Sequence, residues 1–521
     1  MNIEWCISDK DSHLISDVMC KYSLNELEAS VMLNRFAYKQ LSQFFSSYDK
    51  KVCDIINIQA LAKIIYDFRN KVIGIISDYD ADGITSAAMW IKFFRACNIR
   101  YKLWMPKNRT VGYGATQQAI DEFNEYQIDL LLTLDCSITK SFHDINYMIC
   151  TIDHHLGQKL HPNTICVNPH QNSDLDKYKD LSTAGLSYFV IEYLKSHYFY
   201  VDIEIDTLAC IGTLGDIMPV TGINRQIIQA GVNAKQLIGV KILCELLQKE
   251  INYITFMYYV IPCLNAAGRI SDVKYSLEFL LTDDVTEAYN LAKILISLNE
   301  QRKKIEEETY KDVCVELDTT TNILIATSEK WHSGVLGIVA SRLTKEFNKP
   351  VFLFRKQLDV HKGSARSNNV HIGHMIQQSV QIGLAVNGGG HKNAGGATIS
   401  VDKFAEWSSW MQKNIIHNMS SVLNIDLIAT LQNVRKIDLS KIEPFGHGHP
   451  APFILIRNIY LCRVTQYNNH LMCTFDQKYN FFMFRCSAQQ RIKITRLLNK
   501  YVNVVVQYSS YFPIIDIQMT C

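Results

Sequence analysis

The sequence predicts an α/β protein in which a long helix joins two α/β domains and a small β-barrel follows. Three observations predict this fold. From residue 71 to about residue 220, short apolar runs alternate with helical stretches, which is typical of βαβ units and a parallel sheet. Residues 285–315 are charged, have helical spacing and contain neither Pro nor Gly. Residues 421–521 hold short runs rich in Ile, Val, Phe and Tyr, as expected for a barrel.

A helical segment over residues 1–70 is the first predicted element. Apolar residues recur at helical spacing in LNELEASVMLNRFAYKQLSQFF and again over residues 57–68. We expect this segment to pack on the parallel-sheet domain, which we place at residues 71–284. The strands of that domain are predicted at IGII, LLLTL, MICTI and ICVN. Binding sites in such sheets form at the carboxyl ends of the strands.

The second α/β domain, residues 316–420, follows the connector helix over residues 285–315. It begins with the strand-like run NILIATS, continues with the helical GVLGIVASRLTKEF and the strand-like PVFLF, and ends in Gly-rich loops. The strands of the β-rich domain, residues 421–521, are predicted at FILIRNIYLCRV, HLMCTFD, FFMFRC, NVVVQY and IIDIQM.

The composition is that of a soluble globular protein. Of the 521 residues, 48% are hydrophobic and 20% are charged, and 53 basic against 51 acidic residues give a net charge of +2. Any nucleic-acid site must therefore be a local basic patch. The 15 cysteines form no CxxC pair, which suits a reducing cytosol. There is no signal-peptide pattern and no apolar run of about 18 residues, so we expect a cytoplasmic protein without a membrane span.

In the stretch SDYDADGITS, three aspartates stand at alternate positions after a predicted buried strand. Alternate residues of an extended chain point the same way, so we expect Asp78, Asp80 and Asp82 to converge, with Gly83 free to turn. Carboxylates that close raise one another's pKa unless a cation lies between them. An EF-hand is excluded because Met89 stands where the calcium loop needs Glu. The alternative is a set of solvated loop aspartates that end a strand.

Three further groups of Asp and His follow apolar runs. Asp135 ends LLLTLD, the triplet Asp153, His154 and His155 follows MICTI, and Asp216 lies in IGTLGDIMP. Each group alone is a common turn or hydrogen-bonding pattern, but four strand ends of one predicted sheet would each deliver Asp or His. Oxygen and imidazole ligands without cysteine suit Mn²⁺ or Mg²⁺, and less strictly Zn²⁺. Two such ions, bridged by one carboxylate, can activate water and stabilise a leaving phosphoryl oxygen.

In order and spacing, these four groups resemble the four motifs of the DHH phosphoesterases. Further stretches are similar to the RecJ group of that family, the single-strand-specific exonucleases of bacteria, and the resemblance covers nearly the whole chain. These stretches are NRTVGYG, VNPHQ, IPCLNAAGRI, WHSGVLGIVASRL, GSARS, NGGGHKNAGG and PFGHGHPAPF, in that order. The resemblance implies a DHH domain, a DHHA1-type second domain and an OB-fold-like C-terminal domain.

The activity implied by the resemblance is a metal-dependent 5′→3′ exonuclease that degrades single-stranded DNA to 5′ mononucleotides in DNA repair and recombination. The cofactors implied are two ions of Mn²⁺ or Mg²⁺. The partners implied are single-stranded DNA, a helicase and a single-strand-binding protein, and the chain is expected to be a monomer. Two alternatives stay open: a nanoRNase or oligonucleotide phosphodiesterase of the same family, and a non-catalytic DNA-binding relative.

The same resemblance assigns the residues of the metal centre. Asp135 would bridge the two ions and is, with His155, a catalytic residue; His155 would lie close to the scissile phosphate as a charge stabiliser or proton donor. Asp153 would orient a ligand rather than bind metal, and Asp78 would do one or the other. The implied metal ligands are Asp78, Asp80, Asp82, Asp135, His154 and Asp216.

Nine residues are implied to bind the substrate. Arg109 and Tyr113 would clamp and stack the first nucleotide, and Arg366 would pair with phosphate. Each has a structural alternative: core packing for Tyr113, helix packing for Asn265 and Arg269, a surface salt bridge for Arg366, and a tight turn for the glycines. The nine are Arg109, Tyr113, Asn265, Arg269, Ser364, Arg366, Gly389, Gly390 and His391.

Four residues depart from the motifs of the RecJ group, and Ile76 stands where many DHH enzymes, though not the RecJ group, have His. Ser137 and Thr183 stand where Gly is usual, Ala365 replaces the middle Gly of SGRS, and Ser333 replaces the acid of WHEG. None of the four removes a predicted metal ligand.

Overall fold

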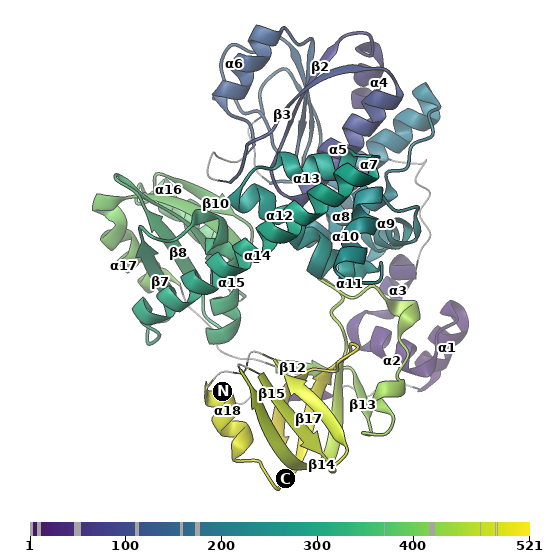
Figure 1. Ribbon diagram of the computed structural model, residues 1–521, viewed down its shortest axis with the longest axis vertical. Helices are drawn as coiled ribbons and strands as arrows, with labels where there is room; N and C mark the ends of the chain where they lie inside the picture. The colour runs from purple at the N-terminus through teal and green to yellow at the C-terminus, as the bar shows by residue number, and fades with distance from the viewer. Residues whose placement is uncertain are drawn as a thin grey trace. The chain divides into compact units, whose positions relative to one another are not determined.

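The computed structural model in Figure 1 describes residues 4–7, 12–45, 54–109, 114–156, 160–171, 178–368, 370–415, 422–468, 470–484, 486 and 488–520. The chain divides into two compact units. The α/β unit comprises Tyr48–Met218 and Ile223–Asn418, and the β unit comprises Met1–Ser47, Pro219–Gly222 and Met419–Cys521.

A five-stranded parallel sheet, in the order β3-β2-β4-β5-β6, forms the first domain of the α/β unit. Four of its strands lie at the predicted apolar runs, because strands covered on both faces need continuous hydrophobic sequence. The sequence does not predict β3, since RYKLW mixes charged and apolar residues, as an edge strand can. The strands are β2 (Val72–Ser77), β3 (Arg100–Trp104), β4 (Leu130–Leu134), β5 (Met148–Ile152) and β6 (Thr164–Val167).

Helices dominate this domain beyond β6, so the predicted alternation of strands and helices up to residue 220 is wrong there. The run IGTLG lies in α8 (Asp206–Gly215) and not in a strand. Its glycine is required by close helix packing, because a Cβ on Gly212 would lie 2.3 Å from the Cβ of Ala184. The helices are α4 (Ile58–Asp67), α5 (Ala81–Ala96), α6 (Gln117–Tyr126), α7 (Thr183–Leu194), α8, α9 (Gly222–Asn233), α10 (Ile238–Leu246), α11 (Tyr253–Thr255), α12 (Ile261–Ile270) and α13 (Lys274–Leu281).

The connector helix α14 (Val285–Glu316) lies where the sequence predicts it and leads into a mixed sheet of order β10-β11-β9-β8-β7. Only the β7–β8 pair is parallel within this sheet as described. The predicted Gly-rich loops are largely strands, since β10 and β11 form a hairpin of small residues. The elements are β7 (Leu324–Ser328), α15 (Ser333–Phe347), β8 (Val351–Lys356), β9 (Val360–Arg366), α16 (Ile372–Gln381), β10 (Asn387–Gly390), β11 (Ala394–Ser400) and α17 (Phe404–Asn414).

The main sheet of the β unit is antiparallel, in the order β16-β15-β14-β17-β18, with β13 added in parallel to β14. Its strand content agrees with an OB-like domain, although no pairing between described residues closes the sheet into the predicted barrel. A separate parallel pair joins β1 to β12. The elements are β1 (Glu4–Ile7), β12 (Val422–Ile425), β13 (Leu427–Ala429), β14 (Phe453–Tyr467), β15 (His470–Phe475), β16 (Tyr479–Met483), α18 (Ala488–Thr495), β17 (Tyr501–Gln507) and β18 (Ile514–Met519).

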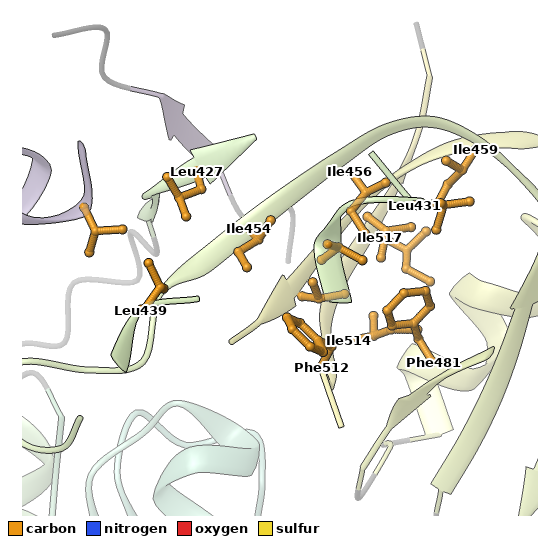
Figure 2. Packing of buried hydrophobic residues seen from close by; sticks show 14 of the residues in the cluster. Leu427, Leu431, Leu439, Ile454, Ile456, Ile459, Phe481, Phe512, Ile514 and Ile517 are labelled. Carbon is orange, nitrogen blue, oxygen red and sulfur yellow. The ribbon is translucent and has the colours of Figure 1, made fainter. Parts of the chain in front are cut away.

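The N-terminal helices α1 (Ser12–Tyr22), α2 (Glu26–Arg35) and α3 (Tyr38–Phe45) belong to the β unit. Their apolar side chains share one core with the sheet residues of Figure 2, and Arg35 pairs with Asp426 at 2.7 and 2.8 Å.

The prediction that residues 1–70 pack on the parallel-sheet domain is therefore wrong for these three helices. Of the four helices described within residues 1–70, α4 packs there, against α7 and β6. An amphipathic stripe shows that a helix covers a core but does not show which core. No helix within the described ranges joins the length and the apolar character that crossing a bilayer requires.

Candidate metal centre

The DYDAD segment turns from β2 into α5, so its aspartates do not follow one extended strand. Asp80 is the N-cap of α5, and its side chain accepts hydrogen bonds from the N–H groups of Asp82 and Gly83 at 3.0 and 3.2 Å. Gly83 is helical rather than a turn residue, and a Cβ there would lie 2.5 Å from the carbonyl oxygen of Asp78. Asp82 turns with the helix and does not share a ligand group with Asp78 and Asp80, but the charges of all three aspartates act on Asp135, as the predicted convergence on one small volume requires.

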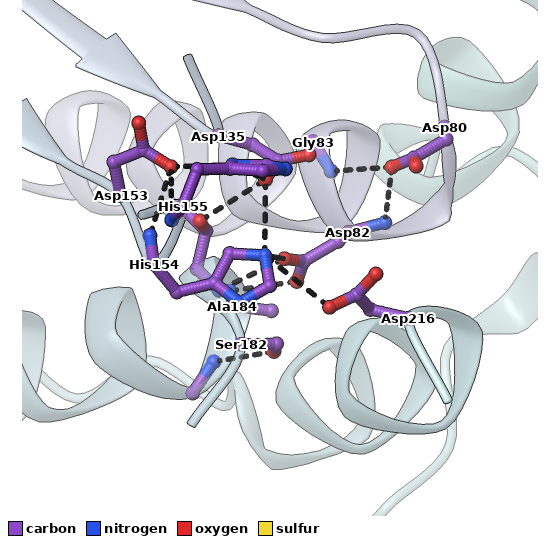
Figure 3. A network of polar contacts seen from close by, with 12 residues as sticks. Asp80, Asp82, Gly83, Asp135, Asp153, His154, His155, Ser182, Ala184 and Asp216 are labelled. Atoms are coloured by element: carbon purple, nitrogen blue, oxygen red, sulfur yellow. Dashed lines mark hydrogen bonds and ion pairs between the residues drawn. The ribbon is translucent and has the colours of Figure 1, made fainter. Parts of the chain in front are cut away.

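The predicted metal ligands nevertheless come together. Ligand atoms lie within 4.8 Å of one another in each of three groups: Asp78, Asp80 and Asp135; Asp135, His154 and His155; and Asp82, His154 and Asp216. Because Asp135 and His154 each belong to two of these groups, the three form one continuous centre. The Nε2 atom of His154 lies 3.3 Å from Asp216, 3.6 Å from Asp135 and 4.0 Å from Asp82 (Figure 3).

Two kinds of backbone present these ligands. Asp135 and the Asp153–His155 triplet follow β4 and β5, whose ends lie side by side because the strands are parallel. Asp216 instead is the C-cap of α8, so it reaches the centre from a helix end and not from the predicted strand end. The prediction that Asp216 lies in the centre agrees with the structure, but the predicted secondary structure at this position is wrong.

Asp153 is occupied by donors from the protein itself. Its Oδ1 atom accepts hydrogen bonds from the N–H groups of His154 and His155 at 2.8 and 3.1 Å and lies 2.7 Å from Nδ1 of His155. Its Oδ2 atom accepts a hydrogen bond of 2.6 Å from the hydroxyl of Ser137. This arrangement orients the His155 ring, as the predicted role of Asp153 requires.

The charges of this pair support each other. Burial alone would raise the pKa of Asp153, but the hydrogen bond and the charge of His155 outweigh burial and lower that pKa to about 2. Burial alone would lower the pKa of His155, but the hydrogen bond and charge of Asp153 raise it. His155 is therefore held toward its protonated form.

The pKa values of four other carboxylates of the centre are raised, in contrast to that of Asp153. Burial, followed by the charge of Asp80, raises the pKa of Asp82 to about 7 and that of Asp78 well above its usual value. Burial and then the charge of Asp82 raise the pKa of both Asp135 and Asp216. A divalent cation among these carboxylates would reverse the repulsion.

The donor set fits such a cation. The Nε2 atom of His154 and the Oδ2 atom of Asp216 are buried, and neither makes a hydrogen bond with any described residue. Burial lowers the pKa of His154 to about 3, which leaves the imidazole neutral and able to act as a metal ligand. Buried polar atoms without partners are rare, and here two of them lie in a centre of oxygen and imidazole ligands of the kind that Mn²⁺ and Mg²⁺ accept.

A set of three arginines, here named the arginine pocket, lies next to this centre. It consists of Arg109, which donates to the Ser364 hydroxyl at 3.1 Å, Arg269, which donates to the carbonyl of Gly334 at 3.2 Å, and Arg366. Burial, followed by the charge of Arg109, lowers the pKa of Arg269 and of Arg366 to about 10. Among the described residues, the arginines that form ion pairs with carboxylates are Arg35, Arg302 and Arg342. None of the three arginines of the pocket forms such an ion pair within the described ranges.

The other predicted substrate residues fall into three classes. The Oδ1 atom of Asn265 accepts a hydrogen bond of 2.9 Å from Ala81, so this side chain supports the start of α5, as the packing alternative expects. The ring of His391 lies 5.7 Å from that of His155, and Gly389 and Gly390 precede it in β10. The predicted Tyr113 lies outside the described residues.

Two family models match the chain: the DHH family N-terminal domain over residues 72–213 and the DHHA1 domain over residues 320–415. Among curated proteins, the single-stranded-DNA-specific exonuclease RecJ of Thermus thermophilus is 28% identical over 74% of this chain and 59% of the relative. RecJ of Bacillus subtilis is 25% identical over 88% of this chain and 62% of the relative. The matches thus span about three fifths of the length of these relatives.

Solved structures agree on the fold. RecJ of Thermus thermophilus in complex with Mn²⁺ has a TM-score of 0.84 at 22% identity and covers 100% of this chain and 80% of the relative. An exonuclease RecJ bound to manganese has a TM-score of 0.61 at 25% identity, covering 71% of this chain and 97% of the relative.

The chain thus contains a DHH domain and a DHHA1 domain. Its DHH domain holds the first three of the four ligand groups, and Asp216 follows three residues after the matched range. Its DHHA1 domain supplies Ser364, Arg366 and His391.

Sequence reasoning gives no role to two residues at the edge of the DHH centre. The hydroxyl of Ser137 donates to Asp153, and that of Thr183 donates to Asp135 at 3.2 Å. Both positions are departures from the DHH motifs, and a departure that replaces Gly with a hydroxyl donor inside a motif is the signal that could have marked them.

Proposed function

We propose that the chain is a metal-dependent exonuclease that degrades single-stranded DNA in the 5′→3′ direction to 5′ mononucleotides, in DNA repair and recombination. The observation that carries the proposal is the adjacency of a centre of carboxylates and imidazoles, which suits cations, and a set of arginines, which suits an anion. The charge of Asp80 acts on Arg269, so the two sites lie within electrostatic reach of each other. A phosphodiester bound to cations at one end and to arginines at the other meets both needs.

Two ions of Mn²⁺ or Mg²⁺ would be held by the six predicted ligands of the centre. Asp135 and His154 each belong to two of the three ligand groups, so each could serve more than one ion position. When bound, such ions supply Lewis-acid activation of the attacked phosphodiester and lower the pKa of water. The relatives whose structures contain Mn²⁺ or Mg²⁺ carry the RecJ name, which supports this choice of ions.

His155 would then stabilise charge on the scissile phosphate or donate a proton to the leaving oxygen. Its pKa is raised, and its ring is oriented through Nδ1 by Asp153, which leaves Nε2 for the substrate. The adjacent ring of His391 offers a second donor from the DHHA1 domain.

The arginine pocket would bind the terminal phosphate of the strand. Three guanidinium groups and the hydroxyl of Ser364 match the charge and the acceptor oxygens of a phosphate monoester. Binding an end at a fixed place relative to the metal centre would restrict cleavage to the first phosphodiester, and thus produce mononucleotides.

The relatives' names support single-stranded DNA as the substrate. Because such an enzyme needs its strand unwound first, a helicase and a single-strand-binding protein are the proposed protein partners. A monomeric state and the cytoplasmic location expected from the cysteines belong to the same proposal.

The test uses purified protein, Mn²⁺ and a 5′-phosphorylated single strand labelled at either end, beside the matching duplex. Mononucleotide should appear first from the 5′ label, the duplex should be spared, and Asp135→Ala should be inactive. Rapid loss of short oligonucleotides with long strands intact would indicate a nanoRNase instead. Binding of DNA without cleavage at any Mn²⁺ concentration would contradict the proposal and indicate a non-catalytic relative.

A further inference from the structure

Thr183 contacts two ligand carboxylates of the metal centre at once. Its backbone N–H donates to Oδ2 of Asp82 at 2.8 Å, and its side-chain hydroxyl donates to Oδ1 of Asp135 at 3.2 Å. The next N–H, that of Ala184, donates to the other oxygen of Asp82 at 2.8 Å. All three contacts are buried, since Thr183 is 0%, Asp82 1% and Asp135 2% exposed.

The two carboxylates belong to different parts of the centre. Asp82 groups with His154 and Asp216, whereas Asp135 groups with Asp78 and Asp80 and also with His154 and His155. They reach the centre from separate elements, the start of α5 and the end of β4. A residue that donates to both carboxylates fixes their separation in a place where their mutual repulsion would otherwise increase it.

The hydroxyl is a property of this chain rather than of the motif. The backbone donors at the first turn of α7 would be present with any residue, but the usual Gly at this position has no side chain to reach Asp135. The contact to Asp82 therefore comes with the helix, and the contact to Asp135 comes with Thr183 alone.

We propose that Thr183 is a positioning residue that pre-forms both metal positions by holding Asp135 at a fixed distance from Asp82. The inference rests on the metal centre of the proposed function. Hydrogen-bond partners of metal ligands generally change metal affinity by 10- to 100-fold when they are removed, because the ligand then has to be ordered at the moment of binding.

The test replaces the hydroxyl and keeps the shape. Thr183→Val retains the branched side chain and both backbone contacts to Asp82, and it loses only the donor to Asp135. Metal-free protein is titrated with Mn²⁺ in a calorimeter, so that the readout is the dissociation constant and not the activity. We expect Thr183→Val to raise that constant by about 10-fold or more.

Two control variants separate the donor from its surroundings. Thr183→Ser keeps a hydroxyl at the same atom position and should restore the affinity of the unchanged protein. Ser187→Ala removes a hydroxyl one turn further along α7, where the side chain is fully buried and its oxygen has no hydrogen-bond partner within the described ranges. It should leave the affinity unchanged. Melting temperatures of the metal-free variants show that each one is folded.

The outcomes distinguish this inference from the function on which it rests. If the unchanged protein fails to bind Mn²⁺, the proposed function is overturned together with the inference. If the unchanged protein binds Mn²⁺ and Thr183→Val binds it equally well, only the role of Thr183 is overturned. Equal weakening by Thr183→Val and Thr183→Ser would also overturn it, since the donor would then not be the cause.

Discussion

The metal centre and the arginine pocket lie side by side in the α/β unit but are assembled differently. Every ligand of the centre comes from the parallel-sheet domain, at the ends of β2, β4 and β5 and at the end of α8. The pocket takes Arg109 and Arg269 from that domain, and Arg366 from the DHHA1 domain. The comparison teaches that the proposed cation site belongs to one domain, whereas the proposed anion site draws on two.

The strongest test of the centre is the loss of its shared carboxylate. Asp135→Asn should reduce nuclease activity to background, because this side chain belongs to two of the three ligand groups. The measurement is the release of labelled mononucleotide, with Mn²⁺ binding followed in parallel. Retained affinity for a DNA strand would show that the arginine pocket survives, and substantial residual cleavage would contradict the assignment.

The proposed role of the arginine pocket is tested by comparing DNA strands that carry a 5′ phosphate with strands that carry a 5′ hydroxyl. Arg366→Ala should lower kcat/KM on 5′-phosphorylated DNA by about 10- to 100-fold, the usual loss for a charge-assisted hydrogen bond, and should affect 5′-hydroxyl DNA much less. The exposed Arg95→Ala is the matched control for charge. An equal loss on both substrates would mean that Arg366 does not read the end group, and Mn²⁺ binding should be unchanged throughout.

The stability of the metal-free protein should depend on pH through the buried carboxylates. The pKa of Asp82 is raised from 3.8 to about 7 in the folded protein, so the folded state binds more protons than the unfolded chain between these values. This group therefore makes stability fall as pH rises toward 7, by about 1 kcal/mol per pH unit. The raised pKa values of Asp78, Asp135 and Asp216 act in the same direction, whereas the lowered pKa of His154 acts in the opposite direction below about pH 6.5. Melting temperatures at pH 5 to about 7 measure this, and saturating Mn²⁺ should remove the decline. A flat profile without metal would show that the carboxylates are relieved in another way.

The smallest expected effect is that of the hydroxyl at the outer edge of the centre. Ser137→Gly restores the usual motif residue and removes one of the donors to Asp153, which keeps three others. We expect kcat to fall by a few-fold, about 3-fold, with KM unchanged, since His155 loses orientation and not contact with substrate. Ser137→Thr should restore activity, and a change in KM alone would point to a role in substrate binding.

The sequence predicts the sheet strands and the metal ligands better than it predicts the hydrogen bonds between them. The sheet strands β2, β4, β5 and β6 were predictable because buried parallel strands are continuous apolar runs, and the ligands follow from the Asp and His residues beside them. Asp216 was predictable as a ligand but not as the cap of a helix, since IGTLG is apolar enough for either structure. The contacts of Thr183 with Asp82 and Asp135 join residues 101 and 48 positions apart, and only the folded chain brings such residues together.

The arginine pocket has a mechanical consequence for the α/β unit. Along the chain, α14 is the covalent link between the two domains that supply the arginines. An anion held by Arg109, Arg269 and Arg366 would add a reversible link to the hydrogen bonds that Arg109 and Arg269 already donate to the second domain. The terminal phosphate of the substrate would thus act as a reversible cross-link between the two domains. Each released nucleotide would remove this cross-link, and binding of the next terminal phosphate would restore it.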